Sequence, residues 1–201
     1  LLNKMLKIGL TGGIGSGKSE VSKFFNSWGA FIFDADKEAK IIIDENEQAQ
    51  KEIINEFGSD VVNADNIIDK KKLARIAFQD EFHQLQLNSI IHPFVFKKID
   101  ENFEKIKSNK KYKAFIVDAA LIYESGADTH MDYVIVVTSL LRFRTERVMA
   151  RGNINRGDFM KRVELQWSDE DKEHMADFTI QNNSDLKGLE KESKKIFNSI
   201  L

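Results

Sequence analysis

The amino-acid sequence predicts an α/β fold built on a five-stranded, mainly parallel sheet. Short apolar runs alternate along the chain with longer stretches of helical period, and three of these runs are almost continuously apolar. Such runs are typical of strands that helices cover on both faces. A glycine-rich segment also separates the first apolar run from the first helical stretch. Together these features predict a three-layer sandwich with a sheet in the middle.

The individual elements follow from the same patterns. The predicted strands are Leu6–Leu10, Ala30–Phe33, Ala114–Val117, Tyr133–Val137 and Phe178–Ile180. The predicted helices are Ser19–Ser27, Lys37–Phe57, two or three between Lys70 and Ile106, Leu140–Arg151, Asp158–Trp167 and about Leu186–Ile200. Gly58 is predicted to end the second of these helices. A break is predicted at His92-Pro93, because proline removes a helix hydrogen bond.

Composition narrows the class of protein. The chain has 201 residues, of which 42% are hydrophobic and 31% charged, as expected of one compact domain. A formal net charge of −2 gives no general electrostatic basis for binding nucleic acid or a membrane. The absence of cysteine excludes disulfides and thiolate metal sites. The first residues, up to Met5, lack a signal-peptide pattern, and no apolar run reaches about 20 residues, so we expect a cytoplasmic protein without an obligate protein partner.

A phosphate-binding loop is the strongest signal in the chain. Residues Gly12–Ser19 match G-x-x-x-x-G-K-[ST] at every fixed position, between a predicted strand and a predicted helix. Glycines let successive backbone N–H groups turn toward phosphate oxygens, and the helix N-terminus adds a partial positive charge. Lys18 is predicted to reach the β- and γ-phosphates of ATP, and Ser19 to ligate Mg²⁺. The predicted nucleotide contacts are Gly13, Ile14, Gly15, Ser16, Gly17, Lys18, Ser19 and Glu20.

Three classes of phosphate-loop protein compete: a small-molecule kinase, a GTPase-type switch and an ATPase motor or remodelling module. Asp118–Leu121 lacks the glycine of a GTPase D-x-x-G motif, and Asn183 replaces the lysine of an N-K-x-D motif in Asn182–Asp185. An ATPase motor usually has an acidic pair after the strand, whereas Ala119 follows Asp118 here. These differences and the size of the chain favour a kinase.

Two carboxylates, Asp34 and Asp36, follow the second predicted strand. Ligands of doubly wound sheets bind at the carboxyl ends of the strands, where a carboxylate can accept a hydroxyl proton as a phosphoryl group arrives. Aspartate is also favoured as the cap of a following helix. Spacing alone does not decide between these two roles.

The ordered motifs resemble those of the dephospho-coenzyme A kinase family. Ile8–Ser19 is similar to the start of these enzymes, and Asp34-Ala35-Asp36 follows at the expected distance. The later matching pieces are Leu73…Phe78, His92-Pro93, Leu121–Glu124, Arg147…Arg151, Gln166, Ala176-Asp177 and Asn182-Asn183. Each later piece is weak alone, but their order and spacing extend the resemblance over nearly the whole chain.

The resemblance implies transfer of the γ-phosphoryl group of ATP to the ribose 3′-hydroxyl of dephospho-CoA, the last step of CoA synthesis. It implies that Asp36 is the catalytic base, that Thr11 lies near the reacting groups, and that Arg147 stabilises the transferring phosphate. Lys18 completes the implied catalytic set. The implied acceptor contacts are Asp36, His92 and Leu121, and Asn182 is implied to lie near the adenine.

The basic residues after the fourth predicted strand have two interpretations. Arg147 and Arg151 share one helix face at i, i+4 spacing, and for Arg147 a functional role is preferred. A solvated basic surface is the preferred interpretation of four others, namely Arg142, Arg144, Arg156 and Arg162. Without the family resemblance, His92 would be interpreted as a helix-break residue.

The chain is therefore predicted to be a single phosphate-loop kinase domain over residues 1–201. Its core is predicted at about 5–60, 112–140 and 176–201, a helical acceptor-binding module at about 65–111, and a lid at about 141–168. Such a lid closes over ATP and excludes water. A kinase for another small hydroxyl or a nucleoside monophosphate, and a nucleotide-dependent switch, remain alternatives.

Overall fold

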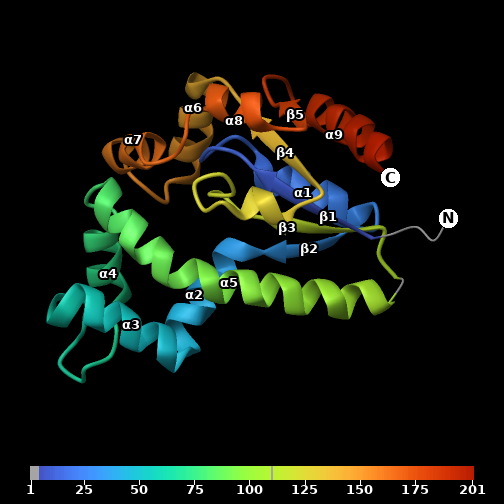
Figure 1. The fold of residues 1–201 in the computed structure, drawn as a ribbon. Helices are drawn as coiled ribbons and strands as arrows, with labels where there is room; N and C mark the ends of the chain where they lie inside the picture. Colours follow the sequence, from blue (N-terminus) through green and yellow to red (C-terminus); the bar gives the residue numbers. More distant parts are fainter. Residues whose placement is uncertain (1–4, 110) are drawn as a thin grey trace. The chain divides into compact units, whose positions relative to one another are not determined.

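A computed structural model of the chain describes residues 5–109 and 111–201 (Figure 1). Residues 1–4, where the sequence argues against a signal peptide, lie outside this range. The chain divides into two compact units. The core unit comprises the residues up to Asp34 together with Glu101–Leu201, and the helical unit comprises Ala35–Asp100. None of the helices in the described ranges has the length and apolar character needed to span a membrane.

The core unit contains a five-stranded sheet in the order β2-β3-β1-β4-β5, and every neighbouring pair is parallel. The strands are β1 Leu6–Thr11, β2 Phe31–Asp34, β3 Ala114–Asp118, β4 Tyr133–Thr138 and β5 Phe178–Gln181. All five predicted strands are confirmed, and each extends one residue past its predicted end. The added residues are polar, so the apolar pattern excluded them. Polar side chains therefore line the carboxyl edge of the sheet, where ligands of such folds bind.

Helices cover both faces of this sheet. Helices α1 (Lys18–Ser27) and α9 (Leu186–Ile200) cover one face. There the rings of Phe25 and Phe197 pack at an interplanar angle of 34° with centroids 5.1 Å apart, in a cluster that includes Ile116. On the opposite face, Phe103 packs edge-on against Phe115 with ring centroids 5.4 Å apart. Phe115 and Ile116 point to opposite faces because side chains alternate along a strand. The core unit thus has the three layers that the sequence predicts.

Three further helices of the core unit follow β4: α6 (Leu141–Arg151), α7 (Arg156–Glu164) and α8 (Asp169–Met175). A 3₁₀ turn, η2 (Ala127–His130), precedes β4. The prediction for α6 is confirmed, and α7 begins and ends slightly before its predicted bounds. Helix α8 was not predicted, because its sequence is charged on every side. Its one buried residue is Lys172, a residue type that a hydrophobic pattern never counts as core.

The helical unit begins with α2 (Ala35–Glu45) and α3 (Glu47–Phe57), where the sequence predicted one helix. Asn46 separates them, because its side chain accepts a hydrogen bond from Ala49 N–H at 2.9 Å and starts a new helix. Gly58 ends α3 with φ 70°, which confirms it as the stop. A 3₁₀ turn, η1 (Gly58–Val61), and α4 (Lys70–Ala77) follow.

Helix α5 (Glu81–Asn109) begins in the helical unit and continues through Pro93. The predicted break at His92-Pro93 is therefore wrong, and so is the interpretation of His92 as a helix-break residue. Proline removes one helix hydrogen bond. Around it, Ile91, Val95 and Ile99 form a buried stripe at i, i+4 spacing, which holds the helix on both sides of the proline.

Candidate active site

The phosphate loop connects β1 to α1 at the carboxyl edge of the sheet, as predicted. Gly15 and Gly17 have φ values of 82° and 104°, which residues with a Cβ rarely adopt. Gly17 stands at the N-cap of α1, and no side chain among the described residues caps this helix. Its first N–H groups are therefore available to an anion.

The Ser16 hydroxyl is the second sign that this loop is built for a ligand. The residue is 1% exposed, and its Oγ has no hydrogen-bond partner within the described part of the chain. A buried polar atom without a partner is costly, unless a bound group or water completes it. The loop and the Ser16 hydroxyl together fit a bound phosphate.

Lys18, the lysine of the motif, meets the end of a neighbouring strand. Its Nζ donates to one carboxylate oxygen of Asp118, the last residue of β3, and Ser22 Oγ donates to the other. Asp118 is 9% exposed, so the ion pair holds Lys18 in a largely buried setting. This contact was not predicted from the sequence, where Asp118 only helped to exclude the GTPase and ATPase classes. The sequence signal for the contact is a single carboxylate at the end of an apolar strand.

Two other predicted residues hold the loop from the side of β5. The Asn182 side chain is buried and donates to the Ser16 carbonyl at 2.7 Å. Arg147 donates to Ser139 Oγ at 3.0 Å and to the Asn182 carbonyl at 2.9 Å. Burial and the neighbouring Arg151 lower the pKa of Arg147. Arg147 and Asn182 therefore lie together beside the loop, and their roles toward nucleotide stay predictions.

Four other predicted site residues of the core unit lie at the end of β1, after β3 and in the first turn of α1. Thr11 ends β1, is buried, and donates to the Ala120 carbonyl at 3.1 Å. Leu121 follows β3 and is half-buried. Ser19 is exposed in the first turn of α1, and Glu20 forms an exposed ion pair with Lys23 at 2.8 Å.

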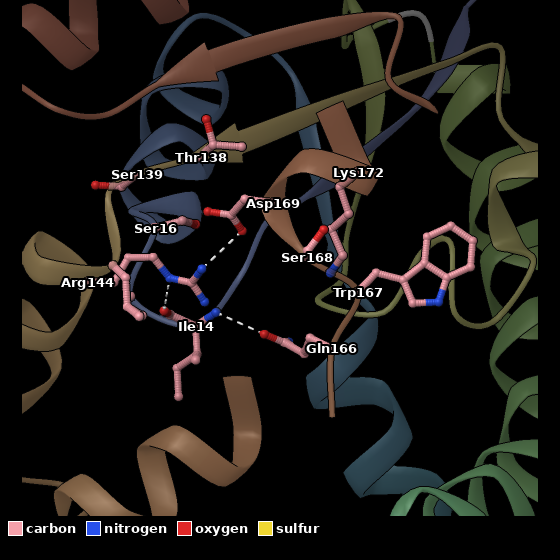
Figure 2. A network of polar contacts seen from close by, with 12 residues as sticks. Ile14, Ser16, Thr138, Ser139, Arg144, Gln166, Trp167, Ser168, Asp169 and Lys172 are labelled. Atoms are coloured by element: carbon pink, nitrogen blue, oxygen red, sulfur yellow. Dashed lines mark hydrogen bonds and ion pairs between the residues drawn. The ribbon is translucent and has the colours of Figure 1, made fainter. Parts of the chain in front are cut away.

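Arg144 is buried, so its interpretation as part of a solvated basic surface is wrong. It is 5% exposed, and its guanidinium donates to the Ile14 carbonyl at 2.9 Å and pairs with Asp169 at 3.0 Å. Figure 2 shows the guanidinium between the phosphate loop and α8. Helical spacing gave no reason to separate Arg144 from Arg142 and Arg156, which are exposed. The difference comes from Asp169, a partner that only the fold brings near.

A second buried charge lies beside this network. Lys172 of α8 is fully buried, and its Nζ pairs with Glu124 Oε1 at 2.8 Å. The same oxygen accepts the backbone N–H of Trp167 at 2.9 Å, while Glu124 Oε2 is buried without a partner among the described residues. The Tyr123 ring stacks on Trp167, and burial together with nearby Asp177 raises the pKa of Tyr123 to about 12. The ion pair joins α8 to the segment that follows β3.

Two predicted site residues belong to the helical unit. Asp36 is exposed in the first turn of α2, two residues after Asp34 ends β2. His92 is half-buried in α5 and stacks on Phe96 with ring centroids 5.8 Å apart, and burial lowers its pKa. Their catalytic and acceptor roles stay predictions.

Metal binding was predicted at Ser19 alone. Among residues 5–109 and 111–201, no group of three or more His, Cys, Asp or Glu side chains is arranged to hold a metal ion. The Ser19 hydroxyl stands in the first turn of α1, directly after Lys18, where the phosphate-loop motif places its Mg²⁺ ligand.

A parallel sheet with the loop Gly12–Ser19 between its central strand and a helix defines a phosphate-loop nucleotide-binding protein. A protein-family model described as dephospho-CoA kinase matches residues 6–188. The chain therefore belongs to the dephospho-CoA kinase family and is a kinase.

Individual relatives agree with this assignment over nearly their full lengths. A dephospho-CoA kinase of Fusobacterium nucleatum is 39% identical over 193 residues, which cover 96% of this chain and 97% of the relative. The solved structure of a dephospho-CoA kinase from Campylobacter jejuni is 29% identical and superposes with a TM-score of 0.68, covering 96% of each chain. A structure from Thermus thermophilus, 28% identical, gives a TM-score of 0.80 over 98% of each chain.

The buried Lys172–Glu124 pair generates a prediction about stability. Lys172→Met leaves the Glu124 carboxylate buried without its cation, so we expect the free energy of unfolding to fall by about 3–5 kcal/mol. The double variant Lys172→Met, Glu124→Gln removes the orphaned charge and is expected to regain much of that loss. Urea unfolding of the three proteins measures both changes. A Lys172→Met protein within about 1 kcal/mol of the parent would contradict the role of the pair.

Proposed function

We propose that this kinase transfers the γ-phosphoryl group of ATP to the ribose 3′-hydroxyl of dephospho-CoA and forms CoA and ADP. The phosphate loop carries the proposal. The start of α1 has no side-chain cap and the buried Ser16 hydroxyl has no partner among the described residues, so both fit the phosphates of a nucleotide. Membership of the dephospho-CoA kinase family supplies the acceptor. A cytoplasmic location stays a prediction from the sequence.

The nucleotide end of the site is assigned to the loop and its neighbours. Backbone N–H groups of Gly15, Gly17, Lys18 and Ser19 would surround the phosphates, and Lys18 would leave Asp118 to reach the β- and γ-phosphates. Mg²⁺, held by the Ser19 hydroxyl and phosphate oxygens, would neutralise phosphate charge during transfer. Asn182 is proposed to lie close to the adenine. Its buried amide beside Ser16 supports a place next to the nucleotide.

The transfer step is assigned to three side chains. The acceptor 3′-oxygen forms a bond to the γ-phosphorus as the bond to the β–γ bridging oxygen breaks, and the hydroxyl proton passes to Asp36. Lys18 and Arg147 would stabilise the negative charge on the transferring group. The role of Asp36 as proton acceptor is supported by its position in the chain. It follows β2, the strand that ends beside β3 at the polar edge of the sheet.

The residues proposed to bind the acceptor are assigned from family membership more than from the geometry of the site. Thr11 is proposed near the reacting groups, because it ends the central strand from which the phosphate loop departs. His92 and Leu121 are proposed as acceptor contacts. The stretch at about 65–111 is proposed as the acceptor-binding module, and the stretch at about 141–168 as the lid.

The activity is tested by following ADP and CoA in the presence of Mg²⁺-ATP and dephospho-CoA. We expect both products to appear together, and only with dephospho-CoA. Adenylate and shikimate serve as alternative acceptors, and Lys18→Ala as the inactive control. ADP formation with adenylate or shikimate, or ATP binding without any CoA formation, would contradict the proposed acceptor.

The role of Asp36 generates a second prediction. Asp36→Asn keeps the size of the side chain but removes the proton acceptor, so turnover should fall by roughly a hundredfold or more. The Kd for ATP should stay within a few-fold. Steady-state kinetics and ATP titration of the variant measure the two effects. Near-normal turnover would remove Asp36 from the base role.

A further inference from the structure

The two peptide groups that flank Ile14 are each held by a side chain from the region after β4. The Ile14 N–H donates to Gln166 Oε1 at 3.1 Å, and the Ile14 carbonyl accepts from Arg144 Nε at 2.9 Å. Figure 2 shows both contacts on opposite sides of the residue. Ile14 lies in the middle of the phosphate loop, so these contacts act on the part that must face a nucleotide.

The Arg144 guanidinium is bound by Asp169 as well as by the Ile14 carbonyl. Its Nη1 pairs with Asp169 at 3.0 Å, and the Arg144 and Asp169 side chains are 7% and 22% exposed. The guanidinium also fills the space beside Gly13, where a Cβ would collide with it. A buried arginine is tolerated only when its N–H groups are satisfied. Arg144 is therefore held in one orientation by a carboxylate and a carbonyl.

This orientation has a consequence for the next residue. The carbonyl of Ile14 and the N–H of Gly15 belong to one planar trans peptide group, in which they point in opposite directions. A hydrogen bond that draws the carbonyl toward Arg144 therefore turns the Gly15 N–H to the far side of the loop. Gly15, with φ 82°, can adopt the conformation that this requires. Successive N–H groups that face one side form an anion-binding concavity.

We infer that Arg144, held by Asp169, is a positioning residue that orients the Ile14–Gly15 peptide group for binding nucleotide phosphate, with Gln166 orienting the preceding peptide group. The inference rests on the proposed nucleotide site and adds residues to it. Arg144 acts through the loop backbone and is not assigned a contact with ATP. Because Gln166 and Asp169 lie three residues apart, a single short segment supports both peptide groups.

Arg144→Ala, Asp169→Asn and the control Arg142→Ala test this inference in the full-length chain. Arg142 is exposed on the same helix as Arg144, so its removal changes the charge of α6 without touching the loop. We expect Arg144→Ala to raise the Kd for Mg²⁺-ATP and the KM for ATP by about tenfold or more, as expected for a hydrogen bond from a charged group. The KM for dephospho-CoA should change by less than about twofold in this variant.

Asp169→Asn keeps the Arg144 contact with the loop but weakens its support, so a smaller rise in the Kd for Mg²⁺-ATP is expected, about threefold. This milder variant decides the question if Arg144→Ala does not fold. In a double variant, the two changes should not be additive, because both act through one guanidinium. Arg142→Ala should match the parent.

The outcomes separate this inference from the proposed function. A parent protein that binds no Mg²⁺-ATP would overturn both. A parent that binds Mg²⁺-ATP, with variants that bind it equally well, would overturn only the role of Arg144. Equal rises in the KM for ATP and for dephospho-CoA would mean that Arg144 merely stabilises the fold, and would also overturn it.

Discussion

The structure depends on holding the backbone of the glycine-rich phosphate loop in one conformation. A glycine-rich loop gains freedom in the unfolded chain, so folding it into one shape is costly. Here two carbonyls of the loop accept hydrogen bonds from side chains far along the sequence: Arg144 donates to Ile14, and Asn182 donates to Ser16. Asp118 holds Lys18, the lysine that ends the loop. The loop is thus supported from the ends of β3 and β5 and from α6, and those segments are supported by it in turn.

The region after β4 is held by buried ion pairs as well as by apolar packing. Helix α8 buries Lys172 against Glu124, and its first residue, Asp169, pairs with Arg144 of α6. A buried ion pair stabilises little relative to apolar packing, but breaking it is costly, so such pairs specify which partners meet. A region assembled in this way is attached to the phosphate loop at defined points. The Arg144–Ile14 hydrogen bond and the Arg144–Asp169 ion pair therefore link α6 and α8 to the phosphate loop.

Much of the fold was predictable because it follows from apolar patterns. All five strands, helix α9 and the phosphate loop were predicted from local sequence, since each is encoded by contiguous residues. The errors have local physical causes: buried residues on both sides of Pro93 carry α5 past the predicted break, and Asn46 splits a helix that periodicity joined. Helix α8 and the buried state of Arg144 were not predictable, because charged residues become core only when a distant partner reaches them. The candidate site was predicted at the loop itself, whereas its supports Asp118 and Asp169 lie 100 or more residues away and carry no motif of their own.

The most direct test of a loop preformed for nucleotide is the response of its own amides, measured by backbone ¹⁵N NMR during titration with Mg²⁺-ATP. Phosphate oxygens that accept backbone hydrogen bonds should shift the amide resonances of Gly15, Gly17 and Lys18, with saturation at the Kd measured by calorimetry. The amides of the exposed end of α9 serve as an internal reference and should not move. Saturable ATP binding that leaves these loop amides unchanged would contradict the account, because the nucleotide would then occupy some other part of the protein.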